Sequence, residues 1–477
     1  MLLPLSLLLS HSVIYLPDII HVIKIKPHYI TRNYCLINNF ILMRHSLTIP
    51  FLSLIVLLYS CDGSLNTNTD GSGQLADISA ADAGFNEKNI SALDSLFNDY
   101  IASQAIASAE IMVVKNGGIA YHKSFSPAGV CKGRDSIYRI MSMTKAITSV
   151  AAMQLYEQGR FLLDDHIENY IPEFKNMQVL QSVNHSDSTY TSVPAQRKIT
   201  IRDLLRHTSG LAYSFSSPEM QIIYPREGVV EAFAVGGEVN TLADNMRVLG
   251  NVPLVHEPGT MYTYGVSTDV LGYLIEVISG QSFDEYLKEH IFEPLGMEDS
   301  YFFVPEEKAG RLAKVYANTE DKPIVKMEPS LITEYQTMTG GKFFSGGAGL
   351  CTTAKDYAIF LQMLLNGGKF GEARLLGTKT IDLMVTNQLA GINPPADNGG
   401  PGERTFAFGL GFELGTDYSY RKRPGSLQRY SWGGALSTTF WWDKENDLAV
   451  IGMIQMHPFF HRDMWRKMEV IIYGAVI

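Results

Sequence analysis

The sequence predicts an α+β fold in which helices flank one antiparallel sheet that is assembled from both ends of the chain. A helix and a hairpin are expected near the front, strands and a helix near the end, and mainly helical segments in between. We find no internal repeat and no clean boundary within residues 86–477. These residues are therefore expected to form one domain with a helical insertion at about residues 160–370.

The front of this domain shows a helix followed by a hairpin. Asn86 precedes apolar residues that recur at spacings of three and four as far as Ile101, which is the pattern of an amphipathic helix with an N-cap. Residues 109–115 and 119–125 flank Asn116-Gly117-Gly118, and glycines after an asparagine between two such runs predict a hairpin.

The next helix is predicted over Ser142–Gln158 and is apolar nearly all round, as expected of a helix buried on all sides. Gly159 is placed to end it. Further helices are expected over Ile201–His207, Ser267–Ser279, Ser282–Ile291, Ala354–Asn366 and Arg462–Ala475. Strands are expected over Thr405–Leu414, Gln428–Trp432, Ser437–Trp442 and Leu448–Met456, with a turn at Asp443–Asp447.

Composition narrows the class of protein. Of 477 residues, 46% are apolar and 18% are charged, which is too apolar for a disordered chain. The formal net charge of −10 argues against a nucleic-acid partner, because phosphates are bound by basic surfaces. A soluble globular protein, large enough to bury a core, is expected instead.

The first 60 residues differ from the rest, with four basic residues against one acidic residue. Met43-Arg44-His45 precedes an uncharged run from residue 46 to residue 60, which is the pattern of a secretory signal and is shorter than the ~18 residues that span a bilayer. Leu58-Tyr59-Ser60-Cys61 resembles a bacterial lipoprotein cleavage box, in which Cys61 would be lipidated. An ordinary cleaved signal with an incidental cysteine is the alternative.

This interpretation divides the N-terminal region into three parts. We expect an upstream extension over residues 1–42, a lipoprotein signal peptide over 43–60, and a flexible tether over 61–85. The product would be anchored through lipid to a membrane of the bacterial cell envelope and exposed to the periplasm or the outside.

Ser142-Met143-Thr144-Lys145 is the main candidate for chemistry. Serine at the start of a helix lies near free N–H groups and the positive end of the helix dipole. Lys145 is one turn further on the same face, within reach of the Ser142 hydroxyl. Burial would favour its neutral, basic form. Ser419-Tyr420-Arg421-Lys422 has the same spacing, but it is predicted to lie in a polar loop and is interpreted as a coincidence.

A Ser-x-x-Lys sequence that opens a buried helix behind a hairpin resembles the serine β-lactamase and penicillin-binding-protein superfamily. Further similar segments follow in the family's order: Gly159–Asp165, Ile199–Gly210, Pro258-Gly259 with Tyr264 and Asp269–Gly272, Pro294–Met297 and Gly346–Leu350. The resemblance covers about residues 86–470. It implies a β-lactamase/transpeptidase-like fold, Ser142 as the acylated nucleophile, and Lys145 and Tyr264 as proton carriers, the tyrosine as a phenolate or as a hydroxyl bonded to Lys145.

One departure from this resemblance bears on the substrate. Ser431-Trp432-Gly433-Gly434-Ala435 stands where the family has a Lys-Thr-Gly triplet, whose lysine holds a substrate carboxylate. The resemblance implies that the N–H groups of Ser142 and Ala435 form the oxyanion hole and that Trp432, Gly433 and Gly434 contact substrate. Trp-Gly-Gly resembles the β-lactamase-like carboxylesterases often called family VIII. The segment Tyr264-Gly265-Val266 also favours an esterase over a lactamase, because it lacks the asparagine of the lactamase Tyr-x-Asn motif.

The sequence gives little support for other kinds of functional site. No Gly-x-Ser-x-Gly elbow, phosphate-binding loop or dinucleotide fingerprint occurs, and no cofactor is implied. His207 is expected to make structural hydrogen bonds. His457 and His461 have a zinc-like spacing, but Pro458 breaks the helix that it requires, so no metal is expected.

The leading hypothesis is a lipid-anchored serine hydrolase that cleaves carboxylic esters through an acyl-enzyme on Ser142. The alternatives are a β-lactamase or D-amino-acid carboxypeptidase of the same fold acting on amides, a penicillin-recognising protein that is acylated without turnover, and a catalytically silent module. Retention of Ser142, Lys145 and Tyr264 argues against silence.

The lipid anchor gives a testable prediction. In a bacterial host the protein should incorporate labelled palmitate and stay in the membrane fraction, and Cys61→Ala should abolish labelling, because a lipoprotein cysteine supplies the several acyl chains that stable anchoring needs. Radiolabelling and fractionation measure both. A soluble, unlabelled wild-type product would contradict the anchor and leave the hydrolase hypothesis untouched.

Overall fold

The computed structural model describes residues 73–477, apart from 128–129, 131–132, 234–238, 320–321 and 393–405. The expected signal peptide, Cys61 and the first part of the tether lie outside the described residues. Among the described helices, none is long and apolar enough to cross a membrane.

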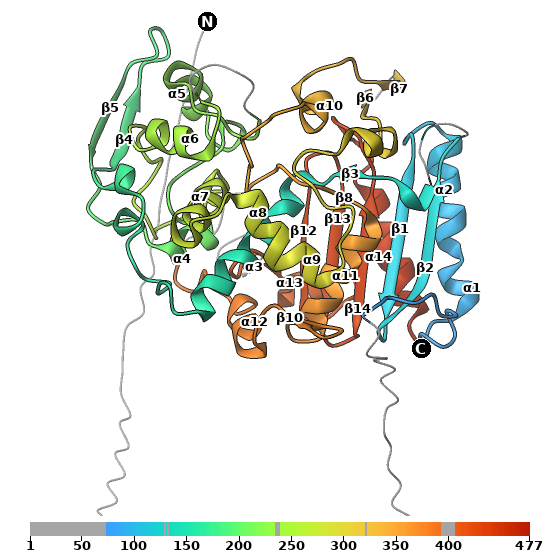
Figure 1. Ribbon diagram of the computed structural model, residues 1–477. Coiled ribbons are helices and arrows are strands. Elements are labelled where there is room, and N and C mark those ends of the chain that lie inside the picture. The colour runs from blue at the N-terminus through green and yellow to red at the C-terminus, as the bar shows by residue number, and fades with distance from the viewer. Residues whose placement is uncertain (1–72, 128–129, 131–132, 234–238, 320–321, 393–405) are drawn as a thin grey trace, which may run out of the picture. The chain divides into compact units, whose positions relative to one another are not determined.

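One six-stranded antiparallel sheet organises the domain, in the order β11-β12-β13-β14-β1-β2 (Figure 1). Its strands are β11 (Glu413–Leu414), β12 (Arg429–Gly433), β13 (Thr439–Asp443), β14 (Leu448–Met453), β1 (Ala109–Lys115) and β2 (Gly118–Phe125). β1 pairs directly with β14, so the two ends of the chain meet in the centre of the sheet. The predicted α+β architecture is confirmed.

The alternation of side chains along β1 builds a core on each face of the sheet. Ile111 and Val113 pack with α1 (Glu87–Ile90), α2 (Ala92–Ala102) and α14 (Asp463–Ala475), whereas Met112 and Val114 join the larger core on the other face. The hairpin turn is tight because Asn116 and Gly117 have φ angles of 52° and 77°, the conformation that an Asn-Gly turn favours.

The tether is shorter than expected, because residues 75–85 belong to the folded domain. Leu75 and Phe85 are buried, the Ile78 N–H donates to the Ile119 carbonyl, and Phe85 forms a bridge with Val476. Residues 62–74 are polar, so the sequence did not indicate that packing begins at Leu75.

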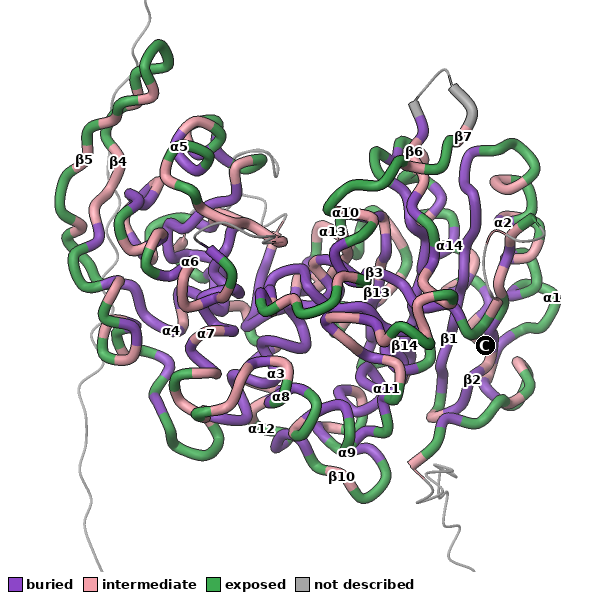
Figure 2. The backbone as a smooth tube through the Cα atoms, turned by 45° about the horizontal axis from the view of Figure 1, so that its top comes forward, coloured by how far each residue is buried: buried purple, intermediate pink, exposed green. Residues whose placement is uncertain are grey.

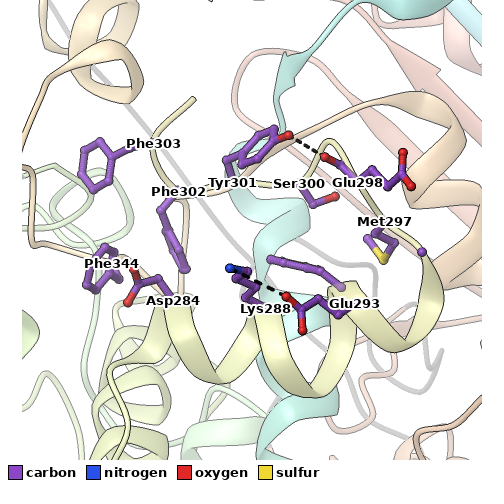
Figure 3. Close-up of a pocket in the computed structure, with 12 residues that line it drawn as sticks. Asp284, Lys288, Glu293, Met297, Glu298, Ser300, Tyr301, Phe302, Phe303 and Phe344 are labelled. Atoms are coloured by element: carbon purple, nitrogen blue, oxygen red, sulfur yellow. Dashed lines mark hydrogen bonds and ion pairs between the residues drawn. The ribbon is translucent and has the colours of Figure 1, made fainter. Parts of the chain in front are cut away.

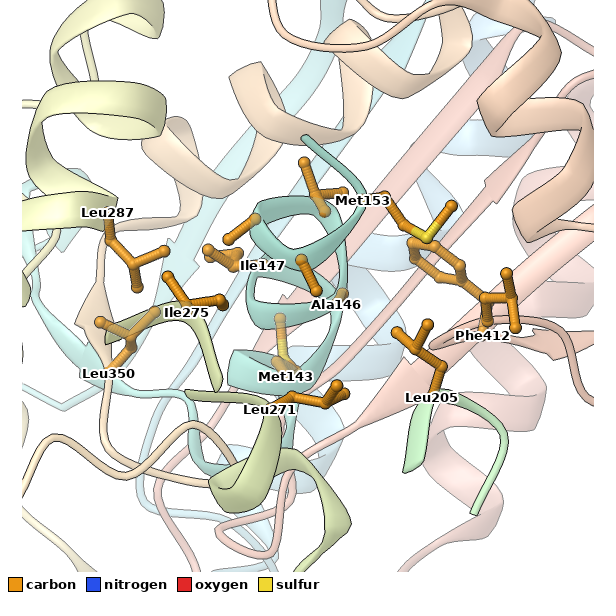
Figure 4. Close-up of a cluster of buried hydrophobic side chains, with 14 of the residues drawn as sticks. Met143, Ala146, Ile147, Met153, Leu205, Leu271, Ile275, Leu287, Leu350 and Phe412 are labelled. Carbon is orange, nitrogen blue, oxygen red and sulfur yellow. The ribbon is translucent and has the colours of Figure 1, made fainter. Parts of the chain in front are cut away.

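Helix α3 (Thr144–Glu157) lies at the centre of the larger core, and every residue from Thr144 to Leu155 is buried (Figure 2). Leu205, Leu271 and Leu350 surround it (Figure 4). Gly159, with φ of 68°, follows the C-cap residue Gln158 and ends the helix as predicted.

The insertion is mainly helical, but it also contains two hairpins that were not predicted. Its helices include α4 (Ile201–Leu205), α5 (Met220–Glu227), α6 (Leu242–Leu249), α7 (Ser267–Ser279), α8 (Phe283–Leu287), α9 (Glu293–Leu295), α10 (Leu331–Glu334) and α11 (Ala354–Leu365), and α12 (Thr378–Met384) follows it. The hairpins are β4 (Gln178–Val183) with β5 (Tyr190–Pro194), and β6 (Tyr316–Thr319) with β7 (Lys322–Lys326). Short pairs join β3 (Tyr138–Arg139) to β8 (Cys351–Thr352), and β9 (Lys369–Phe370) to β10 (Ala373–Arg374).

Two expectations near the C-terminal end are wrong. The strand predicted up to Leu414 is reduced among the described residues to β11, because the chain turns at Gly409–Gly411 and the Gly409 N–H donates to the Phe412 carbonyl. The loop predicted around Ser419 is instead the short helix α13 (Asp417–Lys422). Its N-cap is Thr416, whose hydroxyl accepts from the Ser419 N–H.

Candidate active site

Ser142 is the point at which solvent reaches the start of α3. It lies in the single turn η2 (Met141–Met143), and it is the only residue between Ser136 and Leu155 that is not buried. Met141 has φ of 47°, which is uncommon for a non-glycine residue and often marks a functional turn. The long helix directs its N-terminal dipole toward this serine, as the sequence predicted.

Lys145 is 2% exposed and is held by three oxygen atoms. Its Nζ lies 2.7 Å from the Gly347 carbonyl oxygen, 3.0 Å from the Tyr213 hydroxyl and 3.4 Å from Ser142 Oγ. The carbonyl can only accept a hydrogen bond, whereas either hydroxyl can donate or accept. A neutral amine can therefore donate to Gly347 and Tyr213 and still accept the proton of Ser142.

Tyr213 is the site residue that sequence reasoning missed. It follows Gly210 by three residues, and nothing in the sequence separates it from the other 23 tyrosines. Burial, followed by the charge of Asp269, raises its pKa well above the ordinary value. Tyr213 thus stays a neutral phenol at physiological pH, which makes it a partner for Lys145 rather than a base.

Tyr264 lies in the site as predicted, but it contacts Lys145 through its ring and not through its hydroxyl. Its ring centroid is 4.7 Å from Lys145 Nζ and 5.2 Å from the ring of Tyr213. Its hydroxyl is buried and has no hydrogen-bond partner among the described residues. A buried hydroxyl left unpaired in a native site is a candidate for bonding to a ligand.

His207 makes structural hydrogen bonds through its backbone, to the Leu204 carbonyl and from the Thr263 N–H, and its ring packs against Tyr264. Its ring centroid is 5.0 Å from that of Tyr264, and its Nδ1 atom has no partner within the described part of the chain. Burial, followed by the charge of Lys145, lowers the pKa of His207 well below its ordinary value. A neutral ring in aromatic surroundings is the result.

Asp269 of α7 fixes the carbonyl that holds Lys145. Its Oδ1 accepts hydrogen bonds from Ser345 Oγ at 2.6 Å and from the Gly347 N–H at 3.1 Å. A Cβ atom at residue 347 would lie 2.7 Å from the Tyr213 hydroxyl, so only glycine allows this approach. Burial raises the pKa of Asp269 to about 6.

Trp432 forms an aromatic wall beside the two tyrosines. Its ring centroid is 5.4 Å from that of Tyr264 and 5.3 Å from that of Phe408. Beyond it, a Cβ atom on Gly434 would lie 2.4 Å from the Ile140 carbonyl, so the end of β12 passes close to the segment that carries Ser142. Ala435 follows directly and is exposed.

The second Ser-x-x-Lys sequence forms no comparable site. Ser419 Oγ donates to the carbonyl of Thr416, while Lys422 Nζ lies 5.4 Å from the ring centroid of Tyr418. Ser419 and Lys422 therefore each contact another residue of the same short segment and do not contact each other.

The described part of the chain offers no metal site. Among the described residues, no three His, Cys, Asp or Glu side chains are grouped so as to hold a metal ion. Cys351 is a free, buried thiol whose pKa burial raises to about 12. It is therefore no nucleophile at neutral pH.

A serine beside a buried lysine and two tyrosines defines a serine hydrolase or acyltransferase of the β-lactamase fold, and comparison with known proteins agrees. The family model described as Beta-lactamase matches residues 93–470. Protein Rv1367c of Mycobacterium tuberculosis is 35% identical over 341 residues, which cover 69% of this chain and 80% of that protein. The chain belongs to the beta-lactamase family.

Two further proteins are similar to this chain. Monacolin J acid methylbutanoyltransferase of Aspergillus terreus is 28% identical over 415 residues, or 80% of this chain and 95% of that protein. The structure of EstCE1, a hydrolase with promiscuous acyltransferase activity, superposes with a TM-score of 0.67 at 22% identity and covers 81% of this chain and 99% of that one. The latter supports the fold alone.

The hydrogen bonds of Asp269 predict that the activity declines on the acidic side of the pH–rate profile. As pH falls through about 6, protonation should weaken the bond from Gly347 and loosen the carbonyl that holds Lys145, so kcat/KM should fall. Asp269→Asn keeps the accepting Oδ1 atom and should remove this decline. A pH–rate profile of both proteins checks it, and an unchanged decline in the variant would rule out this origin.

Proposed function

We propose that this protein hydrolyses carboxylic esters through a covalent acyl-enzyme on Ser142. The observation that carries the proposal is the placement of Ser142, open to solvent, 3.4 Å from the buried Nζ of Lys145. A hydroxyl becomes a nucleophile when an adjacent base takes its proton, and this pair meets that requirement.

The proton path follows from the contacts. Lys145 takes the Ser142 proton while Oγ attacks the ester carbonyl, and the resulting oxyanion accepts from the N–H groups of Ser142 and Ala435. Collapse breaks the ester bond, and the proton returns to the leaving alkoxide from Lys145, directly or through the free Tyr264 hydroxyl. Water then repeats the sequence and releases the acid.

The surroundings favour neutral, apolar esters over lactams. Trp432 and Tyr264 form one wall, and Phe215 is 70% exposed while its ring is stacked 4.9 Å from that of Tyr213. Arg423 and Arg429 form salt bridges with Glu469, and the Nε of Arg421 donates to the Asp417 carbonyl. These arginines are therefore engaged and do not replace the missing lysine that would hold a carboxylate.

Acyl transfer to an alcohol is the second candidate, because the same acyl-enzyme serves both reactions. The names of the Aspergillus terreus relative and of EstCE1 include this activity. Including a small alcohol in the ester assay, and measuring the new ester against the acid released, separates the two fates of the acyl group.

We also propose that the protein is held at the bacterial cell envelope by lipid on Cys61. The basic start, the uncharged run and the cysteine of residues 43–61 support this, and labelling with palmitate tests it.

The nucleophile can be identified chemically. A fluorophosphonate probe should label Ser142 alone, and Ser142→Ala should abolish labelling and activity while Ser419→Ala leaves both unchanged. Lys145→Ala should lower kcat by at least ~10², the usual effect of losing a general base. Mass spectrometry of labelled peptides and esterase kinetics provide the measurements. Loss of activity in Ser419→Ala with retention in Ser142→Ala would refute the assignment.

Separate tyrosine variants distinguish the two phenols. Tyr264→Phe should lower kcat by at least ~10² if its free hydroxyl protonates the leaving group. Tyr213→Phe removes a contact of Lys145 and should also impair catalysis. A Tyr264→Phe protein with wild-type kcat would exclude that hydroxyl from the proton path.

Trp432 provides the test of substrate class. Wild-type enzyme should hydrolyse short p-nitrophenyl esters far faster than a chromogenic cephalosporin, because an indole offers no cation to a carboxylate. Trp432→Lys should shift the preference toward the cephalosporin by roughly tenfold to a hundredfold in kcat/KM, which corresponds to a charge-assisted contact of about 1.5–3 kcal/mol. Equal wild-type activity on both substrates would overturn the esterase proposal.

A further inference from the structure

A cavity of about 440 Å³ lies in the helical insertion and contains none of the catalytic residues (Figure 3). Its walls come from α8, α9 and the segments around residues 296–303 and 344. The volume falls in the range of small-molecule pockets, which are mostly apolar with a few placed polar groups.

The floor of this cavity is aromatic. Phe302 and Phe344 lie with ring centroids 5.3 Å apart, and Phe303 lies 6.0 Å from Phe344. Their faces carry negative electrostatic potential, so such a floor favours both apolar groups and cations.

The polar groups of the cavity are predominantly acidic. Asp284, Glu293 and Glu298 line it together with a single base, Lys288. Lys288 is exposed and its Nζ lies 3.7 Å from Glu293 Oε1, so its charge is directed to that carboxylate at the rim. The pocket therefore carries an excess of negative charge.

Asp284 is the group that lacks a partner. Its Oδ1 atom is buried, and no described residue donates a hydrogen bond to it. Figure 3 shows its carboxylate beside Phe344. Asp284 lines the cavity and forms no salt bridge with a described basic residue, so a cation in the cavity can pair with its carboxylate.

A neighbouring carboxylate strengthens the argument. Burial, followed by the charge of Asp284, raises the pKa of Glu276 to about 7. Glu276 accepts a hydrogen bond from the Phe283 N–H at the start of α8, and no salt bridge joins either acid to a described basic residue. Neither carboxylate therefore has a cationic partner among the described residues, and Asp284 is the one that lines the cavity.

We propose that this cavity binds an organic cation with an apolar body, such as an aryl- or alkylammonium compound. The ammonium group pairs with the Asp284 carboxylate, and the apolar body lies against Phe302 and Phe344. Phe344 immediately precedes Ser345, which bonds to Asp269, so the bound cation would lie next to the catalytic loop without occupying the catalytic site.

Three ligands of one shape and different charge test the proposal: 3-phenylpropylamine, 3-phenylpropanol and 3-phenylpropionate. Binding is measured by calorimetry on protein already labelled at Ser142, which keeps the ligands out of the catalytic site. The amine should bind at least about tenfold more tightly than the alcohol, and the acid more weakly still.

Matched variants assign the binding to Asp284. Asp284→Asn should weaken amine binding by at least about tenfold and leave alcohol binding unchanged, whereas Glu285→Gln, which removes the same charge from the next residue outside the pocket, should have no effect. Circular dichroism confirms that both variants are folded. Equal affinities for amine and alcohol, an unchanged Asp284→Asn variant, or no amine binding at millimolar concentration would each overturn the proposal.

Discussion

The architecture of the active site depends on keeping the side chain of Lys145 buried yet bonded. A lysine amine taken out of water needs hydrogen-bonding partners at fixed positions, and Gly347, Tyr213 and Ser142 provide them. Each comes from a different part of the chain. The helix α3 positions the lysine and the serine, and long-range packing brings the other two residues to it.

The surrounding fold supports this arrangement at two levels. The sheet joins both chain ends and provides a rigid surface on which α3 is buried, with Met112 and Val114 contributing to the same core. Closer to the site, the Gly347 N–H donates to Asp269 of α7, and this bond fixes the position of the Gly347 carbonyl. Helix α7 therefore positions the amine of Lys145 indirectly. Ser142 is the partly exposed member of the serine–lysine pair, so its hydroxyl is the one that substrate can reach.

Several features of the fold and of the catalytic pair could be predicted from the sequence because they depend on neighbouring residues. The Asn116-Gly117 turn, the apolar run of α3 and the one-turn spacing of Ser142 and Lys145 are encoded within a few residues. The strand expected up to Leu414 failed because a turn of glycines interrupted an apparently continuous pattern.

Other features were hidden because they depend on tertiary contacts. Tyr213 meets Lys145 across 68 residues of chain, and nothing in its local sequence marks that encounter. The neutral environment of His207 and the unpaired oxygen of Asp284 likewise arise from packing, not from spacing. The packing of residues 75–85 onto the domain was concealed in the same way.

The central claim is that Ser142 becomes covalently acylated with the help of Lys145. The most direct measurement mixes the enzyme with p-nitrophenyl acetate, quenches it in acid within one turnover, and locates the acetyl group by peptide mass spectrometry. The account predicts acetylation of Ser142 in the wild-type protein and its loss in Lys145→Ala. An acetyl group on another residue, or turnover without any trapped acyl-enzyme at Ser142, would contradict it.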